Sequence, residues 1–156
     1  TLSKTTRAFD SLNQGVSFPF KYDKTHDFSV NLVHRFNTRI IANATWVYTT
    51  GVPITLQESQ FGGANLTGGP TIAATLYAYG DRNAERLHDY HRLDIGVSFV
   101  KQKEKVERTL NLGIYNVYNR TNEFYTYLAG TAEGGNEYAS LNLFPIIPSV
   151  RLAIKF

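Results

Sequence analysis

The sequence has no cysteine, no apolar run long enough to form a membrane helix, and only a small excess of one charge. Without cysteine the chain can form neither a disulfide framework nor a thiolate metal site. A transmembrane helix needs about 18 or more consecutive apolar residues, and no such run occurs. The 16 basic and 13 acidic residues leave a net charge of +3 and are dispersed, so they do not indicate a nucleic-acid partner. A signal peptide is also missing, and we expect that it was removed or that the chain is a C-terminal piece.

Aromatic residues, in contrast, are abundant, with ten Tyr, ten Phe and one Trp. Aromatic side chains favour β-strands and membrane interfaces. Several segments alternate apolar and polar residues with the period of two that a strand with one apolar face produces. The predicted strands are 27–36, 39–50, 90–101, 108–118 and 147–156, and residues 1–8 resemble the end of another. The sequence therefore predicts an all-β, antiparallel protein.

The predicted connections sort into two length classes along the chain. The links at 37–38 and 102–106 are short, whereas 9–25, 51–89 and 119–146 are long, with a short strand allowed at 71–79. Short turns on one side and long loops on the other are typical of outer-membrane barrels. The predicted strands also have about the 9–11 residues that a tilted strand needs to cross a bilayer.

The last predicted strand has an apolar face that ends on an aromatic residue. That face consists of Val150, Leu152, Ile154 and Phe156. Such a strand resembles the closing strand of outer-membrane barrels, which the barrel-assembly machinery recognises, and we interpret these four residues as that signal. The same alternation also fits an edge strand of a soluble β-sandwich, where the apolar face would be a core. The sorting of the connections favours the barrel.

Longer stretches of the sequence resemble one family of barrels. The stretches are FPFKYDKTHDFSV (18–30), TWVYTTGVPITL (45–56), RNAERLHDYHRLDIGVSF (82–99), LNLGIYNVYNRTNEFYTYL (110–128) and LFPIIPSVRLAIKF (143–156). Together they resemble the C-terminal barrel region of TonB-dependent outer-membrane transporters, particularly the kind common in Bacteroidetes. The resemblance covers nearly all of residues 1–156. Two positions depart from it: His88 stands where relatives often have Pro, and Glu123 stands where Asn-Pro-Phe-Tyr is common.

The resemblance implies a transmembrane antiparallel barrel of about 22 strands with a plugged lumen. Residues 1–156 would supply about the last six strands, and the plug and the earlier strands would precede Thr1. The implied function is import of a nutrient (a glycan, a peptide or a metal chelate) across the bacterial outer membrane, with energy from TonB acting on the plug. The implied partners are outer-membrane lipid, the rest of the barrel, TonB and a surface lipoprotein. Both ends of the full protein would be periplasmic, and no cofactor is implied.

The sequence offers little for catalysis or metal binding. His88, Asp89, His91 and Asp94 are close in sequence, but their spacing on a strand does not direct three or four ligands to one point, so we predict no metal site. No nucleophile elbow or phosphate-binding loop occurs, and we predict no enzymatic activity. An outer-membrane barrel enzyme remains an alternative, for which Asp89, His91 and Asp94 are the candidate residues. A soluble β-sandwich binding module is a further alternative.

Ligand contacts are predicted in the long loops. Aromatic and Arg side chains suit the binding of sugars or peptides. The candidates in 51–89 are Tyr77, Tyr79, Arg82 and Arg86. Packing between loops is the favoured explanation of the same residues, and the sequence does not identify the transported substrate.

Overall fold

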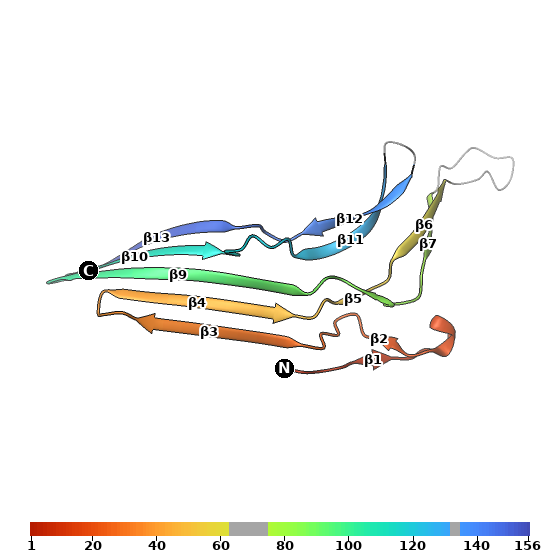
Figure 1. Ribbon diagram of the computed structural model, residues 1–156, viewed down its shortest axis with the longest axis horizontal. Coiled ribbons are helices and arrows are strands. Elements are labelled where there is room, and N and C mark those ends of the chain that lie inside the picture. Colours follow the sequence, from red (N-terminus) through yellow and green to blue (C-terminus); the bar gives the residue numbers. More distant parts are fainter. Residues whose placement is uncertain (63–74, 132–134) are drawn as a thin grey trace.

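The computed structural model describes residues 1–62, 75–131 and 135–156 and consists of antiparallel β-sheet (Figure 1). Its largest unit, the main sheet, contains five strands in the order β13-β10-β9-β4-β3. These strands are β3 (Asp27–Arg35), β4 (Ile40–Thr49), β9 (Tyr90–Lys103), β10 (Val106–Tyr115) and β13 (Ile147–Lys155). The five long strands expected from the alternation are therefore all present. None of the helices in the described residues has the length and apolar character to cross a membrane.

The short connections lie together at one end of the main sheet (Figure 1, left). Between β3 and β4, the Asn37 Oδ1 accepts hydrogen bonds from the backbone N–H groups of Arg39 (2.8 Å) and Ile40 (2.9 Å). Between β9 and β10, only Glu104 and Lys105 form the turn, and Glu104 has a φ of 36°. The predicted link at 102–106 was thus too long, because β9 and β10 pair as far as Lys103 and Val106.

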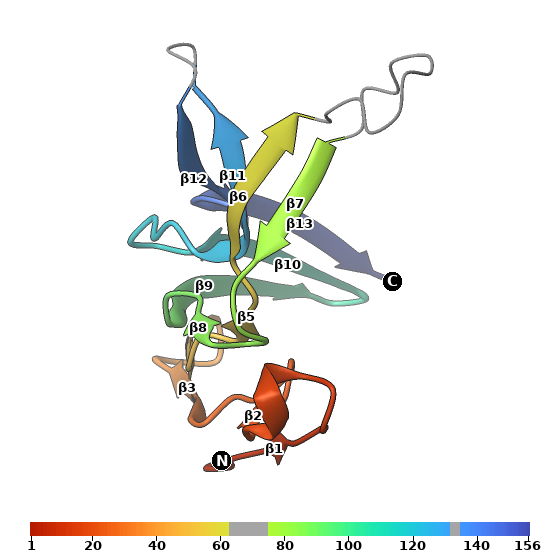
Figure 2. The same ribbon diagram turned by 90° about the vertical axis from the view of Figure 1, so that its right-hand side faces the viewer.

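The long connections lie at the other end, and they are not the irregular loops that we expected. Two of the three, 51–89 and 119–146, each contain a two-stranded hairpin, which we call an arm: β6 (Gln57–Gly62) pairs with β7 (Thr75–Tyr79), and β11 (Glu123–Gly130) pairs with β12 (Asn136–Asn142). The short strand expected at 71–79 is β7, and residues 71–74 lie outside the described part. Figure 2 views the molecule from this end, and two hydrogen bonds join the arms, from Gln60 to Asn136 and from Tyr138 to Gln57.

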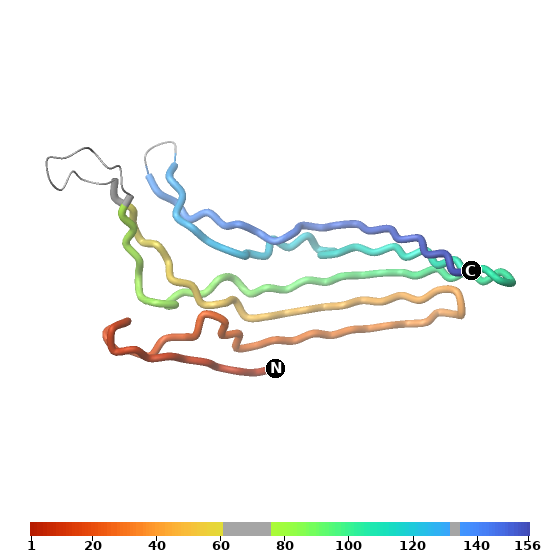
Figure 3. Tube along the Cα trace, turned by 180° about the vertical axis from the view of Figure 1, so that it is seen from behind, coloured from red at the N-terminus to blue at the C-terminus, as the bar shows by residue number. Residues whose placement is uncertain are grey.

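Between the main sheet and the arms lie four very short strands and a turn of 3-10 helix. They are β1 (Thr6–Arg7) paired with β2 (Phe18–Pro19), β5 (Pro53–Ile54) paired with β8 (Glu85–Arg86), and η1 (Asn13–Gly15). The expected strand end at 1–8 lies beside the start of β3, with Leu2 bridged to His26, and continues past it as β1 (Figure 3). We call this whole region the collar: residues 1–26, 50–56, 80–89, 116–122 and 143–146.

The pairing register of the main sheet aligns its apolar side chains on one face. One row runs from Leu32 through Ala44 and Ile95 to Ile114, and the next runs from His34 through Ala42, Val97 and Leu112 to Val150. This apolar face is exposed: Leu32 is 64% and Val150 is 73% accessible. None of the residues in the five main-sheet strands is buried. The main sheet is a single open layer, and in the described residues it neither closes into a barrel nor packs on a second sheet.

Burial is confined to the collar. The only buried hydrophobic side chains in the described residues are Phe18 and Leu87. Four polar residues are also buried, and the other two buried residues are a glycine and a proline: Asp23, Asn83, Asn116, Asn122, Gly51 and Pro53. The side chains that can form a rigid site therefore gather at the end of the sheet that carries the arms.

Candidate functional site

The four predicted ligand residues are separated in the structure. Tyr77 and Tyr79 lie on the β7 arm strand and are exposed, whereas Arg82 and Arg86 lie in the collar. Arg86 has a structural role: its guanidinium pairs with the Asp23 carboxylate and donates to the carbonyl oxygens of Asp23 (3.1 Å) and Gly51 (2.9 Å). This guanidinium holds the pKa of the buried Asp23 below its usual range.

The four residues considered as metal ligands each have different partners. The His88 Nδ1 contacts Glu123 Oε2 at 2.9 Å, and the Asp94 Oδ2 pairs with Arg92 at 3.0 Å. Asp89 accepts from the Tyr48 hydroxyl (2.6 Å) and the Gly51 N–H (3.0 Å), which hold its pKa below the usual range. His91 contacts the Tyr118 hydroxyl at 2.8 Å. Among the residues that the structure describes, no group of three or more His, Asp or Glu is arranged to hold a metal ion.

The collar encloses a cavity of about 810 Å³, which we call the collar cavity. Its walls come from segments that are far apart in sequence, within 21–24, 49–55, 82–90 and 123–126, and from Leu143. Of the predicted ligand residues, only Arg82 lines this cavity. The Arg82 backbone is held by the Asn13 side chain, which accepts from its N–H (2.8 Å) and donates to its carbonyl (3.2 Å).

Hydrogen bonds of a buried polar residue, Asn83, help to hold the wall of the collar cavity in place. The Asn83 amide donates to the Pro19 carbonyl (2.8 Å), and the Asn83 N–H donates to Thr55 Oγ1 (3.0 Å). Asn83 has a φ of 55°, a left-handed conformation that Asn tolerates better than most residues. These bonds join β2, the residue after β5 and the turn before β8 across long sequence separations, and hydrogen-bonded buried groups of this kind position a wall rigidly.

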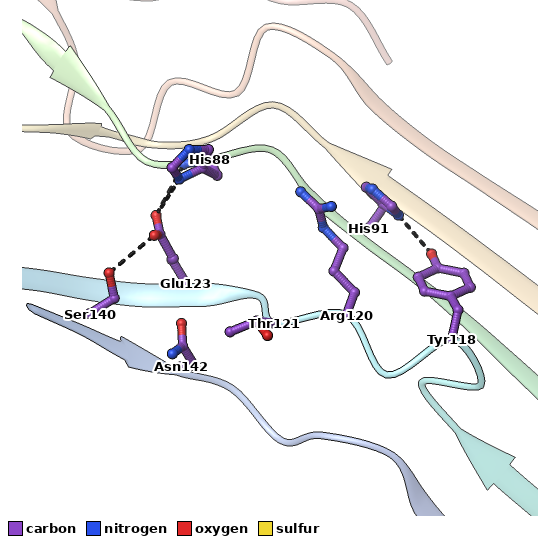
Figure 4. Close-up of a pocket in the computed structure, with 8 residues that line it drawn as sticks. All are labelled: His88, His91, Tyr118, Arg120, Thr121, Glu123, Ser140 and Asn142. Carbon is purple, nitrogen blue, oxygen red and sulfur yellow. Dashed lines mark hydrogen bonds and ion pairs between the residues drawn. The ribbon is translucent and has the colours of Figure 1, made fainter.

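A second cavity of about 570 Å³ adjoins the apolar face at the collar end of the main sheet; Figure 4 shows the residues that line it. Glu123 projects from β11 toward His88, and the Ser140 hydroxyl donates to its other oxygen at 3.0 Å. The bond to His88 holds the pKa of Glu123 below its usual range. Arg120, which lies between the two histidines, donates to the Asp89 carbonyl at 3.0 Å. Because His88 and Glu123 also line the collar cavity, this pair is shared by the walls of both cavities.

The segment after β10 contains two residues that the sequence analysis did not single out. Asn116 is completely buried: its amide donates to the carbonyls of Arg120 (2.9 Å) and Phe144 (3.3 Å) and accepts from the Arg120 N–H (3.0 Å). Asn122 bonds both backbone groups of His91 through its side chain. Repeated asparagines after a strand are the available sequence signal, because Asn forms local side-chain bonds and adopts positive φ.

No protein-family model, no curated protein and no solved structure matches the chain.

Proposed function

We propose that the chain is the C-terminal barrel segment of a TonB-dependent outer-membrane transporter that imports a nutrient. The observation that carries this proposal is the main sheet, in which five strands of nine to fourteen residues expose a continuous apolar face. In water such a face has no partner, whereas in a bilayer lipid covers it. The sorting of turns and arms to opposite ends supports the same conclusion.

The composition of the apolar face supports a membrane location. Aromatic side chains border it at both ends, with Phe28, Trp46 and Tyr48 near the collar and Phe36 and Phe99 near the short turns. Tyr48 and the Ile40 that pairs with Phe99 are eight residues apart. That is about 26 Å along the strand, or about 20 Å in height at a tilt of about 40°. Outer-membrane barrels have an apolar band about 25 Å tall between two aromatic girdles, so the height of about 20 Å is of the same order.

Two cationic side chains lie just beyond the aromatic residues at the short-turn end of the apolar face. Lys101 and Arg108 are paired across β9 and β10 on the apolar face, one row beyond Phe99 and Leu110. Long cationic side chains at this position can keep their apolar stems in the hydrocarbon region while their charges reach lipid phosphates. The apolar band therefore ends where a headgroup layer would begin.

The opposite face suits a wet lumen. Its polar side chains pair with one another: Thr45 donates to Asn31 (2.8 Å) and Ser98 donates to Asn111 (2.6 Å) across strands, and Arg92 pairs with Asp94 on the same strand, β9. Arg92 also lies over the Tyr115 ring at 4.1 Å from its centroid. This face has the polar character that large outer-membrane barrels present to their interior.

The open edges call for further strands. In the described residues β3 and β13 each pair with another strand on one side only, so alternate residues along each edge present free backbone groups, except Asp27, whose backbone bonds Thr1. Exposed edges of this length promote aggregation unless another strand covers them. In the proposed protein the earlier strands of the barrel would pair with both, the plug would fill the lumen, and TonB would act on the plug. A surface lipoprotein would contact the arms.

Transport can be tested in a strain that carries the full-length protein as its only copy. Growth on a panel of glycans, peptides and metal chelates should reveal a nutrient whose use requires the protein. That use should stop when TonB is deleted, because the energy for import comes from TonB. Protein-dependent growth that continues without TonB would disprove the proposal, and so would a panel in which no nutrient depends on the protein.

A further inference from the structure

We propose that the collar cavity binds a ligand that carries carboxylates on an apolar-faced ring. The proposal deepens the proposed function, because this ligand would be the imported nutrient or a part of it. It rests on the charge, the aromatic rings and the packing of the cavity wall, whereas the barrel proposal rests on the main sheet.

The charge of the cavity wall is positive. Three cationic side chains line it, Lys21, Lys24 and Arg82. The ion pairs in the described residues are Arg86–Asp23, His88–Glu123 and Arg92–Asp94, and none of them uses these three cations. An anionic ligand would supply the missing counter-charge in a partly enclosed space, where an ion pair is screened less than on an open surface.

The single acidic residue in the wall is already engaged. Glu123 is the only Asp or Glu among the described lining residues. Its two carboxylate oxygens contact His88 (2.9 Å) and the Ser140 hydroxyl (3.0 Å). A cationic ligand would therefore meet three like charges and one occupied carboxylate, so the wall selects against metal cations and basic peptides.

Exposed aromatic rings supply a second contact surface. Tyr22 is 67% and Tyr125 is 57% accessible, and both line the cavity together with Phe124. Exposed rings beside free cations suit a ligand with an apolar face and an anionic edge. The rings would stack on the face, while the cations would pair with the carboxylates.

The cavity has the size and the support of a preformed site. Its volume of about 810 Å³ lies within the range of small-molecule sites, about 300–1,000 Å³. Both buried hydrophobic side chains of the described residues, Phe18 and Leu87, lie in the collar, and Leu87 is part of the cavity wall. Residues held in this way lose little freedom when a ligand binds, which favours affinity.

Two sources of this ligand chemistry can be separated by calorimetry on the detergent-solubilised full-length protein. Trigalacturonate represents a carboxylated sugar, and its full methyl ester is the neutral control. Benzene-1,3,5-tricarboxylate represents a carboxylated aromatic ring, and its triamide is the neutral control. We expect at least one acid to bind about tenfold or more tightly than its neutral control at low salt, and this difference should shrink as salt rises. The acid that binds identifies the source.

Variants test the location. Lys24→Gln with Arg82→Gln should weaken binding of the preferred acid by about tenfold, as expected for the loss of two partly exposed charge pairs. Lys101→Gln with Arg108→Gln removes two cations from the opposite end of the sheet and should leave the affinity unchanged. Equal affinity for acids and neutral controls, no binding of either acid, or an unchanged affinity in the collar variant would each overturn the proposal. Heat-modifiable migration of the same preparation reports the barrel separately, so loss of binding with an intact barrel counts against the ligand alone.

Discussion

All of the buried residues in the described chain lie in the collar, whereas the main sheet has none. The chain passes directly from one region to the other, yet they obtain stability differently. In the collar, the side chains of buried residues such as Asn83 and Asn116 donate to backbone carbonyls of neighbouring segments, those of Pro19 and Arg120. In the main sheet the polar side chains of one face bond one another, whereas the apolar side chains of the other face are exposed. Under the proposed function lipid would cover the apolar face of the main sheet, whereas the collar buries its own side chains.

The largest effect on folding is expected from a charge placed on the apolar face of the main sheet. Val150 and Ser149 are neighbours on β13, but Val150 lies in the apolar row and Ser149 on the polar face beside Gly113. Val150→Arg should destabilise the inserted barrel by about 2–4 kcal/mol, the cost of Arg near the bilayer midplane. Ser149→Arg should have a much smaller effect because its charge reaches water.

Heat-modifiable migration of the full-length protein on gels measures this difference. The folded fraction of Val150→Arg should fall well below that of Ser149→Arg. Equal folded fractions for the two variants would contradict a lipid-covered face. Loss of folding only in Ser149→Arg would point to a protein partner on the polar face and would reverse the assignment of the two sides.

The main sheet was predictable because its physical cause is local. A strand with different surroundings on its two faces must alternate, and β3, β4 and β13 end within one residue of the predicted limits. In the arms only β7 was expected; the second arm was missed because aromatic residues stand at both parities of β11. Glu123–Gly130 contains Phe124, Tyr125 and Tyr127, all accessible, so no period of two distinguishes one side from the other.

The candidate site was predicted only in part, because it depends on contacts between distant segments. Arg82 was identified, but Arg86 is a structural residue whose partner, Asp23, lies 63 positions away in sequence. The two positions that depart from the family pattern, His88 and Glu123, contact each other, which neither position alone could indicate. The barrel, its transport function and the plug remain predictions.

A second substitution should destabilise the collar and leave the main sheet folded. A Cβ at Gly51 would overlap the carbonyl oxygen of Leu87, a backbone atom that cannot move aside cheaply. Gly51→Ala should therefore destabilise the collar by up to about 3 kcal/mol. Gly130→Ala is the matched control, because a Cβ there meets nothing within 4 Å. Limited proteolysis should cut the collar of Gly51→Ala faster while heat-modifiable migration stays normal; loss of both together would show that collar and sheet are one cooperative unit.

A smaller effect is expected from a single buried amide. Asn116→Ala would leave the Arg120 N–H and the carbonyls of Arg120 and Phe144 without their bonds. The expected cost is about 1–3 kcal/mol. Hydrogen exchange in 116–122 should accelerate, whereas the exposed Asn142→Ala should leave it unchanged. Identical protection in the two variants would mean that the buried amide does not hold this segment.

The smallest expected effect concerns the Glu123–His88 contact and acid. The bond from His88 depresses the pKa of Glu123, so its contribution to stability is complete above the usual glutamic acid range, about pH 4.3, and is lost as the pH falls through the depressed value. The loss should be small, because the His88 side chain is 81% exposed and water screens the pair.

Exchange at the start of β11 should accelerate in wild type below about pH 4. Glu123→Gln should already exchange faster at neutral pH and should change less on acidification. Asp23, whose pKa is also depressed, titrates in both proteins, so only the difference between them reports Glu123. Parallel acid profiles for the two proteins would show that this contact does not anchor the second arm to the collar.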